Sequence, residues 1–89
     1  MTQSFIKDPQ SILDYTVDWA TWLVSDTIST STWTVPTGLT KVIDSKTTTT
    51  ATVWLSGGTV GQIHEVTNEI VTAGGRTDDR TIIIAVQQK

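Results

Sequence analysis

Threonine at nineteen of the 89 positions is the feature that most limits what this chain can fold into. Its side chain is branched at Cβ, so it loses rotamer freedom in a helix and packs well on a pleated strand. Charged residues make up only 17% of the chain, and no long segment has apolar residues at helical spacing. Together these features predict an all-β protein.

Short segments of β-forming residues recur along the sequence and are separated by turn residues. The expected strands are 13–18, 27–35, 39–43, 50–55, 63–72 and 81–86. Turns or loops are expected between them at Pro36 and Gly38, at 56–61 and at 74–75. About six or seven short strands with such turns predict an immunoglobulin-like Greek-key β-sandwich.

Local patterns add detail to three of these segments. Residues 63–72 alternate, with Val66 and Ile70 expected in the core. Between Ile28 and Trp33 the apolar positions change parity, which predicts a β-bulge or a change of sheet. Residues 44–46 are expected to form a loop.

The segment after the first expected strand has a different pattern. Trp19, Trp22 and Leu23 follow at helical spacing, and Asp18 can accept hydrogen bonds from the first free backbone N–H groups. Six residues are too few for a stable helix. Residues 18–23 are therefore expected to form one short helical turn at most.

The length of the chain suits one domain and leaves no room for a second. Residues 1–10 are polar and have no period, so they are expected to be an extended N-terminal arm that becomes ordered only against another protein. Residues 11–89 are expected to form the single β-sandwich domain. A domain this small buries only roughly 60 to 65% of its unfolded surface, so contacts with other subunits would add stability.

The charge pattern argues against nucleic acid and membrane partners. The net charge is −3 and the six Lys and Arg residues are scattered, so no basic stripe can neutralise phosphates. No apolar run of about 18 residues exists, and Lys7 and Asp8 interrupt the region where a signal peptide needs its apolar stretch. The absence of cysteine excludes disulfides and thiolate metal sites.

The reactive side chains are too few to predict an active site. His64 is the sole histidine, with neither an orienting acid on its strand face nor a serine motif nearby. Residues 57–61 lack the lysine of a P-loop, so a β-turn explains these glycines better. Asp78 and Asp79 lack the alternating oxygen ligands of a calcium loop. We expect no catalytic, cofactor-binding or metal-binding residue.

Arg76, Asp78, Asp79 and Arg80 form the densest charge cluster, just before the last expected strand. One interpretation is a solvated turn. Another is that an arginine forms a bidentate pair with a carboxylate of this domain or of a neighbouring subunit, because the planar guanidinium matches a carboxylate. We treat these four as candidate protein-interaction residues.

Four tryptophans accompany a single phenylalanine, and a small core is not expected to hold all four. Trp33 and Trp54 lie within expected strands and are expected in the core. Trp19 and Trp22 flank an irregular segment, so they are candidates for a protein interface, with a satellite core as the alternative.

A set of motifs extends over nearly the whole chain. Those in the first half are Lys7-Asp8-Pro9, Leu13-Asp14-Tyr15, Asp18-Trp19, Trp22-Leu23, Asp26-Thr27-Ile28 and Trp33-Thr34-Val35-Pro36. Those in the second half are Ala51-Thr52-Val53-Trp54-Leu55-Ser56-Gly57-Gly58-Thr59, Val66-Thr67-Asn68 and Gly74-Gly75-Arg76-Thr77-Asp78-Asp79-Arg80-Thr81. On these motifs the sequence resembles the small phage proteins called fibre-tail adaptors. It departs from them at His64, where an aromatic residue is usual, and at Glu69, where a basic residue is common.

The resemblance implies a non-enzymatic structural protein of the phage tail, made in the cytoplasm of the bacterial host. It implies an immunoglobulin-like domain that connects tail fibres to the tail tube or nozzle, with those proteins and further copies in a ring as partners, and with no cofactor, nucleic acid or membrane. The alternative is a capsid decoration or cement protein that stabilises the head shell. A third hypothesis is a carbohydrate-binding module that uses Trp19, Trp22 or Trp54.

Overall fold

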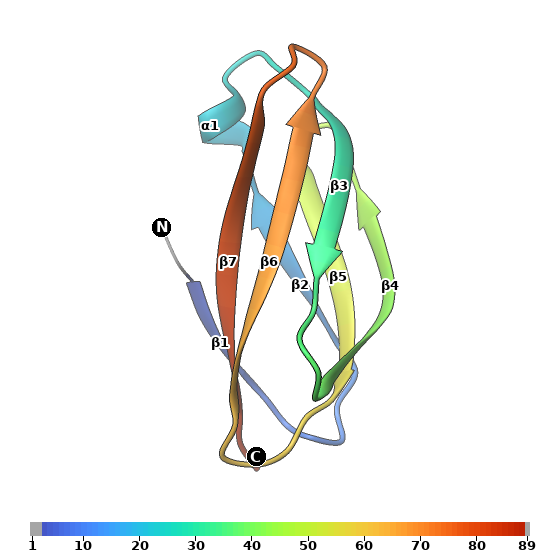
Figure 1. The fold of residues 1–89 in the computed structure, drawn as a ribbon, viewed down its shortest axis with the longest axis vertical. Coiled ribbons are helices and arrows are strands. Elements are labelled where there is room, and N and C mark those ends of the chain that lie inside the picture. Colours follow the sequence, from blue (N-terminus) through green and yellow to red (C-terminus); the bar gives the residue numbers. More distant parts are fainter. Residues whose placement is uncertain (1–2, 89) are drawn as a thin grey trace.

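Two β-sheets lie face to face in the computed structural model, which describes residues 3–88 (Figure 1). In chain order the elements are β1 (Gln3–Lys7), β2 (Leu13–Asp18), α1 (Ala20–Leu23), β3 (Ile28–Thr34), β4 (Leu39–Lys46), β5 (Thr50–Gly57), β6 (Ile63–Thr72) and β7 (Thr77–Val86). The strands run along the long axis of a domain that measures 41 × 23 × 18 Å. The expected helical turn is confirmed as α1.

The four-stranded sheet has the order β1-β7-β6-β3, and the three-stranded sheet has the order β2-β5-β4. β1 runs parallel to β7, whereas all other neighbouring strands are antiparallel. The predicted all-β sandwich is confirmed. These strand orders are compatible with an immunoglobulin-like Greek key, which stays a prediction.

Side chains from the facing sheets alternate inward and fill the core. Val66 and Ile70 of β6 are fully buried, as expected, and Ile84 of β7 is buried beside them. Val53 and Leu55 of β5 cover them from the three-stranded sheet. Burying each such side chain stabilises the fold by roughly 1.5–3 kcal/mol relative to leaving it exposed.

Strand boundaries differ from expectation mainly in β4 and β7, and β5 also continues two residues further, to Gly57. The loop expected at 44–46 is the end of β4, because the turn is closed later, by the Thr47 N–H that donates to the Thr50 carbonyl oxygen at 2.9 Å. β7 begins at Thr77 and not at 81, because its pairing with β6 continues to the hairpin turn. Residues 78–80 therefore lie within a strand. The bulge expected in 27–35 is confirmed by a register shift in β3.

Residues 3–7 of the expected arm form β1 and pair with residues 82–86 of β7 in the same chain. Phe5 packs against the core, and its ring centroid lies 5.0 Å from that of Tyr15. This segment therefore has its partner within the domain, which differs from the expectation that it orders only against another protein. Met1 and Thr2, also part of the expected arm, lie outside the described residues.

Lys7 at the end of β1 is fully buried. Its Nζ donates hydrogen bonds to the carbonyl oxygens of Asp8, at 2.9 Å, and of Gly57, at 2.7 Å. Burial lowers the pKa of Lys7, and the nearby charge of Asp8 opposes that effect. The ammonium group thus ties the end of β1 to the end of β5.

Candidate protein-interaction surfaces

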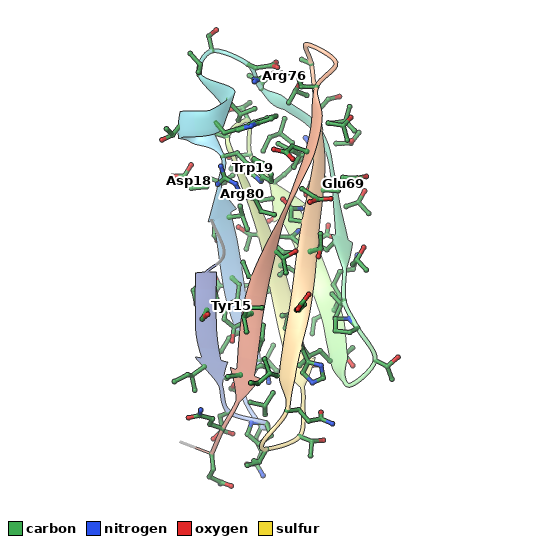
Figure 2. The ribbon with its side chains drawn as sticks, turned by 60° about the vertical axis from the view of Figure 1, so that its left-hand side comes forward. Tyr15, Asp18, Trp19, Glu69, Arg76 and Arg80 are labelled. Carbon is green, nitrogen blue, oxygen red and sulfur yellow. The ribbon has the colours of Figure 1, made fainter. Side chains whose placement is uncertain are left out.

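The six candidate residues gather around α1, the turn before β7 and the first half of β7. Figure 2 shows Trp19 and Arg80 next to each other, with Arg76 farther toward the same end of the domain. We call this part the α1 end; it comprises α1, the β6–β7 turn at 73–76 and the strand ends beside them. The other extremity, which we call the opposite end, comprises the connections at 8–12 and 58–62 and the end of β7.

Trp19 is fully buried beneath the α1 end. Its indole N–H donates to Asn68 Oδ1 at 3.0 Å, and the buried Asn68 side chain in turn donates to Ser31 Oγ at 2.8 Å. Because the indole does not reach the surface, the core alternative holds for Trp19.

Trp22 on α1 is half-buried and meets Trp19 edge-on, with ring centroids 5.3 Å apart and an angle of 70° between the planes. A carbohydrate-binding surface needs exposed coplanar indoles, and these two are neither coplanar nor both exposed. This geometry does not support the carbohydrate hypothesis.

Each of these indoles carries an arginine on its face. The guanidinium carbon of Arg76 lies 4.2 Å from the Trp22 ring centroid, and that of Arg80 lies 4.3 Å from the Trp19 ring centroid. A guanidinium over an indole is attracted by the negative face of the ring. We call these four residues the tryptophan–arginine clamp.

Both arginines also donate hydrogen bonds to backbone carbonyl oxygens of the α1 segment. Arg76 Nη2 donates to Leu23 O at 3.0 Å and Nη1 to Trp22 O at 3.5 Å, while Arg80 Nη1 donates to Asp18 O at 3.0 Å. The carbonyl groups of Trp22 and Leu23 lie at the C-terminal end of α1, where they lack intrahelical partners and basic side chains satisfy them, whereas Asp18 precedes the helix. The arginines therefore have a role within the domain, as one of the sequence interpretations proposed.

Asp26 completes this network. Its Oδ2 lies 3.2 Å from Arg76 Nε, a single contact and not the bidentate pair considered from the sequence, and its Oδ1 accepts the N–H groups of Thr27 and Gly74. The hydroxyl of Thr72, followed by the backbone of Thr27, lowers the pKa of Asp26 from 3.8 to about 2. The carboxylate is thus held in its charged form.

Asp78 and Asp79 are exposed on β7. Asp79 lies directly across from Glu69 of β6, and like charges in such cross-strand pairs are destabilising. Asp78 Oδ1 accepts the N–H of Asp79 at 2.9 Å. The fold gains nothing evident from this acidic pair, so a contact with another protein stays a prediction for both residues.

Most basic side chains within 3–88 are engaged inside the domain. Lys7 is buried, Lys41 pairs with Asp44 at 2.8 Å, and Arg76 and Arg80 belong to the clamp. Six carboxylates form no ion pair with a described residue: Asp14, Asp18, Glu65, Glu69, Asp78 and Asp79. Except beside the partly exposed Arg76, the free surface charge is therefore mainly negative and favours partners with basic surfaces.

Trp54 was expected in the core, and this prediction is wrong. Its indole is 39% exposed on the outer face of the three-stranded sheet, beside the exposed Ile43 of the edge strand β4. The inward positions of β5 are taken by Ala51, Val53 and Leu55. Trp33, in contrast, is buried as expected.

The opposite end exposes a group of aliphatic side chains. Ile6 of β1 and Ile63 of β6 flank Ala85 of β7 in one cross-strand row, and Ile63 is 70% exposed. Ile12 and Val60 are exposed on the connections at the same end. Such a group on a small domain marks a contact with another protein.

Val24, directly after α1, is 86% exposed. Sequence reasoning missed this residue. The one available signal was the pair of apolar residues Leu23 and Val24, of which only Leu23 is buried.

No feature of the described residues indicates reaction chemistry. His64 is mostly buried, and its Nε2 lies 3.1 Å from Gln62 Oε1. Residues 3–88 contain no group of three or more His, Cys, Asp or Glu side chains placed to hold a metal ion. No helix in the same range has the length and apolar character needed to span a membrane.

Comparison with protein families gives a match that covers most of the chain. The model of the family described as podophage GP4 fiber-tail adaptor protein gp77 matches residues 7–85. A search of curated proteins gave no match. The resemblance found from the sequence motifs is confirmed, and the chain belongs to the podophage GP4 fiber-tail adaptor protein gp77 family.

Proposed function

We propose that this protein joins tail fibres to the tail of a podophage virion, as a static adaptor that acts through protein–protein contacts and catalyses no reaction. Membership of the adaptor family supports this role. The observation that carries it is the presence of exposed apolar side chains at both ends of an elongated domain, Val24 at one and the group around Ile63 at the other.

An adaptor must contact two proteins at once. Surfaces at opposite ends allow both contacts without overlap, and the long axis of 41 Å separates them. The clamp fixes one end and the buried Lys7 ammonium fixes the other. A rigid domain of this kind holds its partners at a constant distance and needs no conformational change.

We also propose that several copies form a ring around the tail. A domain of 89 residues offers only a small contact area at each end. Repeated weak contacts to an assembly become strong together, because each bound copy raises the effective concentration of the next.

Electron cryomicroscopy of wild-type and gene-deleted particles tests the proposal. Particles without this protein are expected to have tails that lack attached fibres, and wild-type particles are expected to show copies of it in a ring at the junction. Full fibre occupancy in the deleted particles would refute the adaptor role. Copies spread over the head shell would identify a cement protein in its place.

A further inference from the structure

Val24 combines an unfavourable backbone conformation with a side chain that lies almost wholly in solvent. Its φ is +61° and its ψ is −98°, and it is the one non-glycine residue with positive φ among residues 3–88. Residues with a branched Cβ rarely adopt positive φ, because Cβ crowds the neighbouring backbone. Since the side chain is 86% exposed, core packing does not explain the valine.

The position that Val24 occupies normally favours glycine. The N–H of Asp26 donates to the carbonyl oxygen of Leu23 at 3.0 Å, which closes a turn with Val24 as its first central residue. The angles of Val24 are near those of a type II′ turn, about +60° and −120°, where glycine is preferred. Glycine would make the same turn with less strain, so the stability of the fold does not account for valine here.

Contacts on both sides hold this turn in place. Val24 N–H donates to Ala20 O at 3.1 Å, and Arg76 Nη2 donates to Leu23 O at 3.0 Å. Asp26 is held by the Gly74 N–H and by Arg76. The valine side chain therefore lies on a fixed tip, and ordering it against a partner costs little conformational entropy.

We propose that Val24 is a docking knob that inserts into an apolar socket of a different virion protein, and that the rim of this socket carries a carboxylate or another hydrogen-bond acceptor. The inference rests on the proposed adaptor function and names the kind of partner at the α1 end. An apolar side chain on a convex tip fits a socket of similar size, as interface anchors do.

The chemistry of the rim follows from Arg76. Its side chain is 44% exposed next to the tip, and three contacts to Asp26, Trp22 and Leu23 leave further N–H donors for a partner. A second copy of this chain is the less favoured occupant, because most of its exposed large apolar side chains, including Ile43, Trp54 and Ile63, lie on strands, whose faces are flat. Ile12 and Val60 lie on connections, and the crosslinking experiment below tests contact with them.

The test uses purified particles of the phage that lacks the gene, to which purified protein is added back. The variants are Val24→Gly and Val24→Ala, and the matched control is Val42→Ala, which trims an exposed valine on the edge strand β4. Both Val24 variants are expected to bind the particles about tenfold more weakly or worse, and the control is expected to bind as wild type does. Val24→Gly is expected to unfold at the same or a higher urea concentration than wild type, because it relieves strain.

A photo-reactive aliphatic diazirine residue at position 24 identifies the partner in assembled particles. The expected crosslink is to a virion protein other than this chain, in a segment with apolar residues near Asp or Glu. Crosslinks to another copy, or self-association of the purified protein that Val24→Gly abolishes, would overturn the assignment of the partner.

The remaining outcomes separate this inference from the proposed function. Wild-type binding that Val24→Gly and Val24→Ala leave unchanged would overturn the knob and leave the adaptor role intact. Wild-type protein that does not return to the particles would overturn both. A Val24→Gly variant that is clearly less stable than wild type would show that valine stabilises the fold. This result would overturn the inference, because docking would no longer be needed to explain the valine.

Discussion

The two ends of this domain are held together by different interactions. At the α1 end, Arg76 and Arg80 reach from the hairpin and β7 to backbone carbonyl groups of the α1 segment and stack on two indoles. At the opposite end, the backbone of β1 pairs with β7, and one buried ammonium group, that of Lys7, bonds to two carbonyl oxygens. Charged side chains thus hold an irregular segment in place at the α1 end. At the opposite end, backbone pairing between β1 and β7 provides most of the contacts.

This difference explains why the two ends expose different apolar surfaces. The clamp makes the turn after α1 rigid enough to keep Val24 at positive φ, so this end presents a single side chain on a tip. The opposite end needs no strain, because Ile6 and Ile63 point outward from regular strands and form a flatter patch. One small sandwich therefore offers two contacts of different shape.

The largest effect that tests this comparison is expected from Trp19→Ala. The change removes a buried indole, leaves Asn68 Oδ1 without its donor, and removes the ring under Arg80. Such a substitution is expected to lower the free energy of unfolding by about 3–5 kcal/mol, measured by urea titration with circular dichroism. The control is Trp54→Ala at an exposed indole, for which we expect a loss below about 1 kcal/mol. Equal losses would mean that the clamp does not depend on a buried Trp19.

Regular strands were predicted well where apolar and polar residues alternate over a long segment and glycines lie on both sides of that segment. Segment 63–72 matches β6 in both bounds, and its buried positions include Val66 and Ile70 as expected. The wrong core assignment of Trp54, and the choice left open for Trp19 between an interface and a satellite core, both had a signal that went unused. Trp19 continues the inward alternation of Tyr15 and Val17, and Trp54 falls between the inward positions of β5.

The candidate site was less predictable, because its contacts join segments far apart in the chain. Arg76 and Leu23 are 53 residues apart, and Arg80 and Asp18 are 62 apart, so only the strand register brings them together. Turn propensity could not locate the turn at Val24, because valine is disfavoured at the positive φ that this turn requires.

The second-largest effect is expected at the α1 end, as a loss of stability at low pH. The pKa of Asp26 is lowered from 3.8 to about 2, so its carboxylate contributes stability that is complete above 3.8 and is lost as the pH falls toward 2. Wild type is expected to be more stable than Asp26→Asn above this window and to lose that advantage within it. Urea midpoints across the window measure the difference, and hydrogen exchange at the Gly74 amide reports on this end alone. A difference that does not change with pH would show that Asp26 is not held as the structure indicates.

The smallest effect is expected at the opposite end, as a gain of stability at high pH. Burial lowers the pKa of Lys7 below 10.5, so the unfolded chain keeps this proton to a higher pH than the folded protein does. Stability from this group therefore rises with pH between the lowered pKa and 10.5. Wild type should gain stability relative to Lys7→Met over that range, since methionine keeps the apolar stem and cannot titrate.

Comparing these two proteins also removes the effect of Tyr15. Burial raises the pKa of Tyr15, which lowers stability as the pH rises above 10.0, but this contribution is present in both proteins and cancels in the difference. Exchange at the Gln87 amide, which donates to Lys7 O at 3.0 Å, locates the change at this end. A flat difference between wild type and Lys7→Met would mean that water reaches the ammonium group. In that case backbone pairing alone would hold β1, and the contrast between the two ends would be greater still.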